Sequence, residues 1–448
     1  MPNPAELDVR PLTEIQICEA EPYYTVGLRN APYSYCIGRQ HRFPVHNSGK
    51  TYLAAQTIRD LGMKTLVVAP KISLTQWRRV REGMGAMPYV ENVVNPEALI
   101  TSRKQKLYDA DLGWSTDSRF LVWDEIHRSC SGEKSKSTKA LARWCNRAHP
   151  DNKVLAMSAT PFESPLKLRA LGYLMGFHQF RDADWYRFLR ANGCSLTSRG
   201  GRSHLEFTKD KLRSAAIMRK LREAMGDRFM SITPDQIPGF PEESREVVLV
   251  DLAKEDHDAL VRAYEEMPER IREPSRDEMV KVLRLRQQAE FCKAGALAEM
   301  AANHVEDGCS VFIAVSFTDA RTRIQEYLAK AGIPFASIYG GQPERERQKG
   351  VEAFQRNEVH VMIGMMQACS VALSLHDELH QRPRVSLISP SYSAPEVVQA
   401  LGRIRRVGGT FATQKFVLAA GSVEERVARA IERKIDCLNI LTDEDLIP

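Results

Sequence analysis

The segment that most constrains this chain is half of a phosphate-binding loop. Ser48–Thr51 has the Ser-Gly-Lys-Thr ending of such a loop, and a helical pattern follows from Tyr52 to Ile58. The full signature places a glycine five residues before Gly49, but Pro44 stands there. Proline has no backbone N–H and a fixed φ, so it cannot replace glycine in a cradle of backbone amides. We therefore expect the chain as written to hold phosphate poorly, although it carries the lysine and threonine of a nucleotide site.

Composition and charge are those of an ordinary globular protein. The chain has 448 residues, 43% of them hydrophobic, which suggests two or three domains with sizeable cores. The 63 basic and 57 acidic residues leave a net charge of +6, which permits nucleic-acid binding without requiring it. Nine scattered cysteines with no Cys-x-x-Cys pair argue against disulfides or a zinc site. Without a signal-peptide pattern or a membrane-spanning run, we expect a cytoplasmic protein, in the host cytoplasm if it is viral.

Alternating apolar runs and helical stretches predict an α/β protein with two parallel sheets. Continuous apolar runs, typical of strands buried on both faces, lie at 66–69, 120–123 and 154–157, and a second set of strands is expected at 311–315, 359–363, 385–388 and 416–418. Polar helical sequence fills about 253–305. Between 180 and 245, a Gly/Arg/Ser stretch at 198–203 and a proline-rich stretch at 238–241 break the pattern, so we expect the connection between domains there.

An acidic pair, Asp124 and Glu125, directly follows the apolar run at 120–123. The carboxyl end of a buried strand is where open α/β sheets bind ligands. Asp124 can hold Mg²⁺ beside a nucleotide, and Glu125 can orient or deprotonate an attacking water. The alternative is a surface turn after a strand. Ser158 and Thr160 end the next run and can sense the nucleotide or relay to a bound strand, whereas such residues more often form caps and turns.

Two arginines near the end of the chain, Arg403 and Arg406, are three residues apart. On a helix they share a face. Guanidinium groups stabilise charge on a transferring phosphoryl group, so this pair predicts arginine fingers, with a solvated basic helix as the alternative. Arg405 falls on a different face, and we expect it in solvent.

The order of these elements resembles that of superfamily 2 helicases and translocases. Gly-Lys-Thr, Asp-Glu-x-His, Ser-Ala-Thr and Gln-x-x-Gly-Arg-x-x-Arg follow one another at 49–51, 124–127, 158–160 and 399–406. Residues 68–77 look like motif Ia, and residues 368–375 look like motif V, with Ala372 where glycine is usual. Two further segments look like those of Swi/Snf-type and phage-like members: 240–264 with 283–287 resembles the connection between lobes, and 422–426 resembles the C-terminal segment.

The resemblance covers about residues 48–440 and implies two RecA-like lobes, over 48–245 and 246–448. It implies ATP and Mg²⁺ as cofactors and a nucleic-acid strand as partner, DNA rather than RNA, with no membrane. The implied nucleotide contacts are Ser48, Gly49, Lys50, Thr51, Asp124 and Gln399, of which Thr51 and Asp124 would hold Mg²⁺. Catalysis would fall to Glu125, Arg403 and Arg406, and coupling to Ser158 and Thr160. The alternative is a non-hydrolysing nucleic-acid-binding remnant with a degenerate loop.

The first 47 residues resemble the C-terminal segment of an intein. They are β-rich, with strands expected at 23–28 and 35–38, and end in His46 and Asn47 before Ser48. In that chemistry the Asn47 amide attacks its own carbonyl and cleaves the 47–48 bond, assisted by His46. The Ser48 hydroxyl first takes over the upstream chain as an ester. The resemblance implies a split or interrupted precursor, joined at Ser48 to an upstream fragment that carries an intein N-terminal half. A degenerate loop with an N-terminal extension is the alternative.

Overall fold

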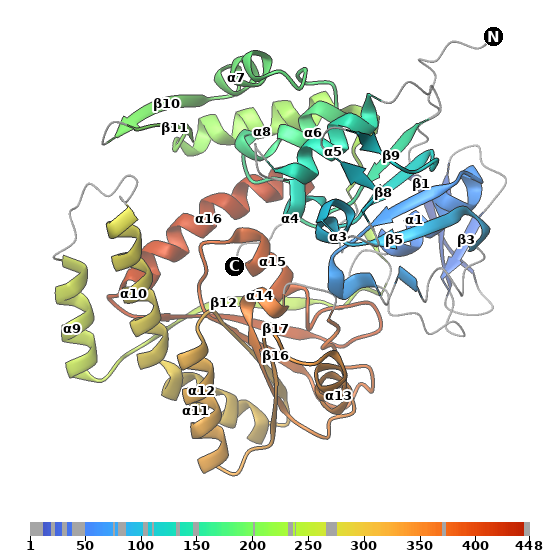
Figure 1. Ribbon diagram of the computed structural model, residues 1–448. Helices are drawn as coiled ribbons and strands as arrows, with labels where there is room; N and C mark the ends of the chain where they lie inside the picture. The colour runs from blue at the N-terminus through green and yellow to red at the C-terminus, as the bar shows by residue number, and fades with distance from the viewer. Residues whose placement is uncertain are drawn as a thin grey trace, which may run out of the picture. The chain divides into compact units, whose positions relative to one another are not determined.

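The chain divides into two compact units, Met1–Pro238 with Asp436–Asp445, and Gly239–Ile435 with Leu446–Pro448 (Figure 1). The computed structural model describes residues 12–18, 23–28, 34–37, 50–74, 77–78, 87–101, 106–109, 112–130, 135–146, 152–199, 202–231, 236–237, 239–265, 276–369 and 373–442. The division falls earlier than the boundary predicted at 245, because β12 (Glu243–Val250) already belongs to the sheet of the second unit.

Three antiparallel strands open the chain, in the order β1 (Leu12–Cys18), β2 (Tyr23–Leu28) and β3 (Ser34–Ile37). Two of them lie where short strands were predicted. Pro44 and the residues from His46 to Gly49 lie outside the described part of the chain. The intein interpretation and the fate of the phosphate loop therefore remain predictions.

A parallel sheet of four strands organises the rest of the first unit, in the order β5-β4-β8-β9. Its strands are β4 (Thr65–Val68), β5 (Val90–Val94), β8 (Phe120–Trp123) and β9 (Lys153–Ala156). Every residue of β4 and β8 is buried, as their apolar runs predict. β9 was predicted to be buried on both faces, but its residues are half-buried, because it is an edge strand of the described sheet.

Helices and short elements surround this sheet. They are α1 (Lys50–Leu61), η1 (Lys71–Ser73), η2 (Met87–Tyr89), α3 (Pro96–Thr101), β6 (Tyr108–Asp109), β7 (Gly113–Trp114), α4 (Ile126–Cys130), α5 (Lys136–Cys145), η3 (Pro165–Lys167), α6 (Arg169–Leu174) and η4 (Gly226–Arg228). Ala54 and Ile58 of α1 pack on one face of the sheet, with Val67 and Val122. The other face carries the larger core, in which Trp123 and Trp144 are fully buried.

Much of the stretch predicted as the connection between domains is folded. It forms α7 (Asp182–Ala191), the antiparallel hairpin of β10 (Cys194–Arg199) and β11 (Arg202–Phe207), and α8 (Lys211–Met225). Buried side chains on both helices join the core of the first unit, among them Trp185 and Met218. Gly193 makes the turn between α7 and β10 at φ +74°, and a Cβ there would clash with Ile217. The Gly/Arg/Ser pattern marked a hairpin turn rather than a linker.

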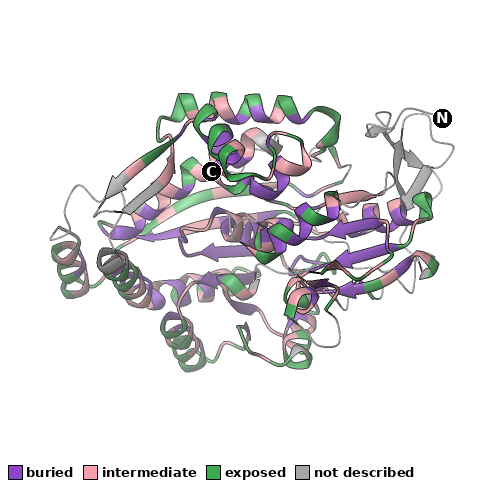
Figure 2. Cartoon of the chain, turned by 45° about the horizontal axis from the view of Figure 1, so that its top comes forward, coloured by how far each residue is buried: buried purple, intermediate pink, exposed green. Residues whose placement is uncertain are grey.

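The second unit contains a six-stranded sheet in the order β12-β17-β16-β13-β15-β14, with every pairing parallel. Its further strands are β13 (Ser310–Val315), β14 (Phe335–Ile338), β15 (Val361–Met365), β16 (Arg384–Ile388) and β17 (Ala412–Ala419). Its helices are α9 (Lys254–Glu265), α10 (Arg276–Cys292), α11 (Ala294–Glu306), α12 (Thr318–Lys330), α13 (Glu344–Gln355), α14 (Met366–Cys369), α15 (Ala394–Leu401) and α16 (Val423–Thr442). Figure 2 shows its central strands in purple, buried between helices.

The parallel sheets of the two units fit the α/β lobes that the sequence predicts. No helix among the described residues is both long and apolar enough to span a bilayer. The carboxyl ends of parallel strands share one edge of a sheet, and in the first unit Asp124 and Glu125 follow β8 while Ser158 and Thr160 follow β9.

Candidate functional site

Lys50 and Glu125 contact each other in the first unit. The Lys50 Nζ lies 2.9 Å from Glu125 Oε1, although 75 positions separate the two residues. Their side chains are 17% and 15% exposed, so water still reaches both. Lys50 is the first residue of α1, and Glu125 follows β8. The structure thus brings together the lysine of the incomplete phosphate loop and the predicted water-orienting carboxylate.

Asp124 is buried beside this pair. Its Oδ2 accepts a hydrogen bond from Trp77 Nε1 at 3.1 Å, and its backbone N–H donates to Val68 O at 2.8 Å, which continues the pairing of β8 with β4. Burial raises the pKa of Asp124 to about 6, and the neighbouring Glu125 carboxylate adds to the rise while Lys50 opposes it. Such a carboxyl favours a nearby cation.

Trp77 is a site residue that the sequence argument did not find. It is 2% exposed and ends the stretch that looks like motif Ia. The sequence did offer one indication of this role, a tryptophan at the end of a motif segment, because a buried indole N–H needs a hydrogen-bond acceptor. The acceptor proves to be the predicted magnesium ligand, so two motif segments meet at one hydrogen bond.

Glu125 adopts a backbone conformation that L-residues avoid. Its φ is +48°, one of three positive values at non-glycine residues in the described chain. The residue forms the tight turn between β8 and α4, where the next residue, Ile126, donates its N–H to Met157 O at 3.1 Å. Positive φ at a non-glycine residue costs about 1–3 kcal/mol and clusters at active sites. The turn directs the Glu125 side chain to Lys50.

His127 links the acidic turn to the segment after β9. Its Nδ1 lies 2.8 Å from Ser158 Oγ and 3.3 Å from Glu125 Oε2. Burial lowers the pKa of His127 to about 4, although the Glu125 carboxylate opposes this shift. The imidazole is therefore neutral near pH 7, and its contact with Glu125 is not an ion pair. The Ser158 Oγ also accepts the N–H of Thr160 at 2.9 Å. Thr160 Oγ1 is buried and has no hydrogen-bond partner in the described part of the chain.

The oxygen donors fit the magnesium that the resemblance implies. Thr51 is 4% exposed and Asp124 is 7% exposed, and both offer the hard oxygen ligands that Mg²⁺ prefers. Among the described residues no group of three or more His, Cys, Asp or Glu side chains could hold a metal. Magnesium often uses one or two protein oxygens together with substrate phosphates, and this donor set matches that habit.

Arg403 and Arg406 lie together in the second unit, but not on a helix as predicted. α15 ends at Leu401 with Gly402 as its C-cap, and glycine is a poor helix former. Both side chains instead donate to one acceptor, the carbonyl of Leu373; the Arg403 Nη1 distance is 3.1 Å. Burial holds the pKa of Arg406 well below its ordinary value, and Arg403 adds to the shift. Their proximity thus comes from a shared backbone carbonyl rather than from helical spacing.

Arg405 is not in solvent, which corrects the expectation. Its Nε donates to Pro241 O and its Nη1 to Glu243 Oε1, each at 2.8 Å. Its guanidinium lies 4.8 Å from the ring centroid of Phe240. The reason is the sheet order: β12 begins at Glu243 opposite Ala412 of β17, so the segment leading into β12 passes the turn after α15. Gln399, a predicted nucleotide contact, is 6% exposed on α15.

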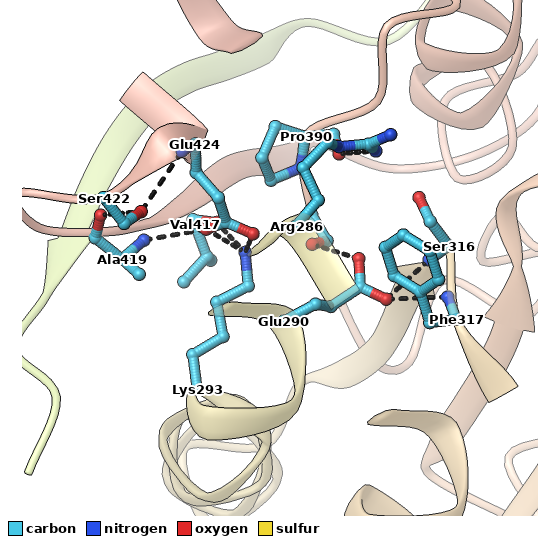
Figure 3. A network of polar contacts seen from close by, with 11 residues as sticks. Arg286, Glu290, Lys293, Ser316, Phe317, Pro390, Val417, Ala419, Ser422 and Glu424 are labelled. Carbon is cyan, nitrogen blue, oxygen red and sulfur yellow. Dashed lines mark hydrogen bonds and ion pairs between the residues drawn. The ribbon is translucent and has the colours of Figure 1, made fainter. Parts of the chain in front are cut away.

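A buried polar network holds the loops at the carboxyl ends of β13, β16 and β17 (Figure 3). Glu290 of α10 accepts the N–H groups of Ser316 and Phe317 at 2.8 Å and the hydroxyl of Ser389 at 2.6 Å. One helical turn on, the Lys293 ammonium bonds to Glu424 at 2.6 and 2.7 Å. Burial raises the pKa of Glu290, and Lys293 opposes the rise. This network fixes the loop that leads into α15 and the arginine turn.

Two comparisons with known proteins indicate what the chain is similar to. Residues 292–408 match the family model described as helicase conserved C-terminal domain. The chain is also similar to a protein of Acanthamoeba polyphaga mimivirus named as an ATP-dependent RNA helicase, with 26% identity over 433 residues that cover 89% of this chain and 78% of the relative. The two matches support a helicase superfamily.

Proposed function

We propose that the protein is an ATP-dependent helicase or translocase of superfamily 2 that moves on nucleic acid. The observation that carries this proposal is the 2.9 Å contact of Lys50 with Glu125, beside the buried Asp124. A phosphate-loop lysine, a cation-binding carboxylate and a water-orienting carboxylate are the parts that P-loop phosphoryl transfer needs. The helicase-type segment at 292–408 supports the nucleic-acid partner.

In this proposal each residue has a distinct task. Lys50 binds the β- and γ-phosphates, and for this its contact with Glu125 must break. The Glu125 carboxylate can then orient the attacking water. Thr51 and Asp124 would hold Mg²⁺, which when bound neutralises phosphate charge. Ser48, Gly49 and Gln399 contribute further nucleotide contacts. Arg403 and Arg406 stabilise charge on the transferring group, and this requires them to leave the Leu373 carbonyl.

Coupling of hydrolysis to the strand would run through Ser158 and Thr160. Ser158 bonds to His127, which in turn contacts Glu125, so a change at the carboxylate reaches the segment after β9. The buried Thr160 hydroxyl has hydrogen-bonding capacity to spare. We propose DNA as the strand, from the Swi/Snf-type resemblance; the relative is named for RNA, so both belong in the assay.

We further propose that the chain matures by splicing at Asn47 and Ser48. The supporting observation is positional: His46-Asn47-Ser48 interrupts the phosphate signature where its backbone amides are needed. Joining an upstream fragment at Ser48 would supply the missing glycine. The alternative, a non-hydrolysing remnant, is less consistent with the intact acidic pair and its contact with Lys50.

The test is ATP hydrolysis by a protein with a complete loop, either the spliced product or the Pro44→Gly variant with Asn47→Ala to block cleavage. We expect nucleic acid to stimulate turnover, and Glu125→Gln to retain ATP binding while losing turnover by a factor on the order of 10². Glu326→Gln, an exposed carboxylate on α12, is the matched control. Normal turnover by Glu125→Gln would contradict the assignment, and ATP binding without hydrolysis by the parent protein would favour the remnant.

A further inference from the structure

We propose that α7, β10, β11 and α8 form a second nucleic-acid-binding surface, outside the motif residues. We call residues 181–228 the basic subdomain. The inference rests on the proposed function, because it assumes a nucleic-acid partner, and it assigns part of the binding to a region that carries none of the predicted motifs. The partner contacts are phosphates of the nucleic-acid backbone.

The first observation is where the charge lies. The basic subdomain holds 12 Lys and Arg against 6 Asp and Glu, a net charge of +6. The full chain also has a net charge of +6, so all other residues together are neutral. A basic excess gathered in one subdomain is the electrostatic footprint of a surface for polyanions.

The second observation is that several of these cations are available. Of the described residues, Arg190, Arg213, Arg219 and Lys220 are exposed and form no ion pair. Arg213 and Lys220 lie two turns apart on α8 and so share a face, while Met218 and Leu221 of the same helix are buried. Exposed, unpaired cations on one helix can take phosphate oxygens without first breaking a contact within the protein.

The third observation is the hairpin. The register sets Arg199 of β10 opposite Arg202 of β11, with Gly200 and Gly201 between them in sequence, so both arginines stand at the end of the hairpin. A two-stranded ribbon of this kind fits the major groove of a duplex. Figure 1 shows the hairpin reaching past the ends of α7 and α8 at the upper left.

The fourth observation is that the basic subdomain is anchored. Trp185 and Phe188 of α7 are buried in the core of the first unit, as is Met218 of α8. Arg169 Nη2 donates to Asp182 Oδ1 at 2.6 Å and fixes the first turn of α7. A fixed platform loses less conformational entropy when it binds than a flexible tail does.

The experiment is a salt titration of nucleic-acid affinity with two charge-neutralised variants of the full chain. One is Arg213→Gln with Lys220→Gln, and the other is Arg199→Gln with Arg202→Gln. The control is Lys330→Gln with Arg356→Gln, which like the first variant removes one arginine and one lysine, and like the second removes two positive charges. Lys330 ends α12 and Arg356 follows α13, so both lie toward the amino ends of β14 and β15, opposite the edge where ligands bind.

We expect the slope of log affinity against log salt to become less steep by about 0.7–0.9 for each phosphate contact removed. The duplex arm should respond most to the hairpin variant, because only a duplex offers a major groove. The control should keep the slope of the wild type. Unchanged slopes in both test variants would overturn the inference while wild-type binding upholds the proposed function. A wild type that binds no DNA or RNA at low salt would instead contradict the proposed function itself.

Discussion

Trp77 holds Asp124 through a single indole hydrogen bond, with 3.1 Å between Nε1 and Oδ2. Both side chains are buried, so water cannot replace the bond if it is lost. The bond joins the segment that looks like motif Ia to the carboxylate that would hold the metal. It is therefore a direct physical connection between two motif segments of the first unit.

We expect Trp77→Phe to weaken Mg²⁺-dependent nucleotide binding by up to about tenfold, the usual cost of an unsatisfied buried acceptor. The measurement is the Mg²⁺-dependent rise in melting temperature with ATP, in a protein with a complete loop. Trp185→Phe is the matched control, a buried tryptophan of the same unit that does not contact Asp124. Equal losses in the two variants would show that the effect is general destabilisation.

The buried pair of Lys293 and Glu424 should control the stability of the second unit. Their side chains are 0% and 2% exposed, so Lys293→Met leaves a carboxylate buried without its counter-charge. We expect a loss of about 3–5 kcal/mol in the free energy of unfolding, measured by urea titration. The double variant Lys293→Met with Glu424→Leu should recover much of this.

A matched exposed pair serves as the control for that prediction. Lys106 and Asp109 contact each other at 2.5 Å, but their side chains are 44% and 30% exposed. Lys106→Met should therefore cost less than about 1 kcal/mol. A Lys293→Met protein as stable as the control variant would show that the buried pair is replaceable by water.

His376 should make the protein less stable in mild acid. Burial lowers its pKa to about 3, and Arg406 and Arg384 add to the shift, whereas its ordinary value is 6.5. The unfolded chain therefore takes up a proton below about pH 6.5 while the folded chain does not, so stability falls as the pH drops. This group alone should cost about 1 kcal/mol between pH 7 and pH 5.5.

The check is urea unfolding at the two pH values for the wild type and His376→Gln. Removing the imidazole should flatten the pH dependence by that amount. A pH dependence that His376→Gln does not alter would mean that the folded protein binds the proton as readily as the unfolded chain.

The junction at 47–48 gives a chemical prediction. The unprocessed chain should bind ATP weakly, and a matching upstream fragment should release residues 1–47 and become joined at Ser48. Asn47→Ala should block release because no side-chain amide remains to form the succinimide, and Ser48→Ala should block joining. Intact-mass spectrometry distinguishes these products. Tight ATP binding by the unprocessed chain would show that residues 1–47 are an ordinary extension.

Much of the fold is legible in the sequence because parallel strands are buried on both faces. The runs at 120–123 and 311–315 predict β8 and β13 almost to the residue. Three strands of the two parallel sheets were missed. β5 and β12 are edge strands that mix polar and apolar residues, and β14, another edge strand, has only four residues. Without burial on both faces, a strand loses the continuous apolar run by which it is found.

The candidate site was predictable in its residue types but not in its contacts. Lys50, Asp124 and Glu125 were found from motif order, yet nothing in their spacing indicates Trp77 as a partner. Arg405 was misplaced because periodicity assumes that a helix continues, and Gly402 ends it. The positive φ of Glu125 has no sequence signal, since glutamate is not a residue that favours that conformation.

α16 has a consequence for how the protein is made. The first turn of α16 lies in the second unit, where its Glu424 bonds to Lys293. Near the end of the helix, Cys437 and Ile440 pack into the core of the first unit. A ribosome that has finished residue 238 has therefore not yet supplied every side chain of that core. The first unit is begun before the second but cannot be completed before the second has almost all been made, so during synthesis the first unit must wait, partly assembled, until the final helix emerges.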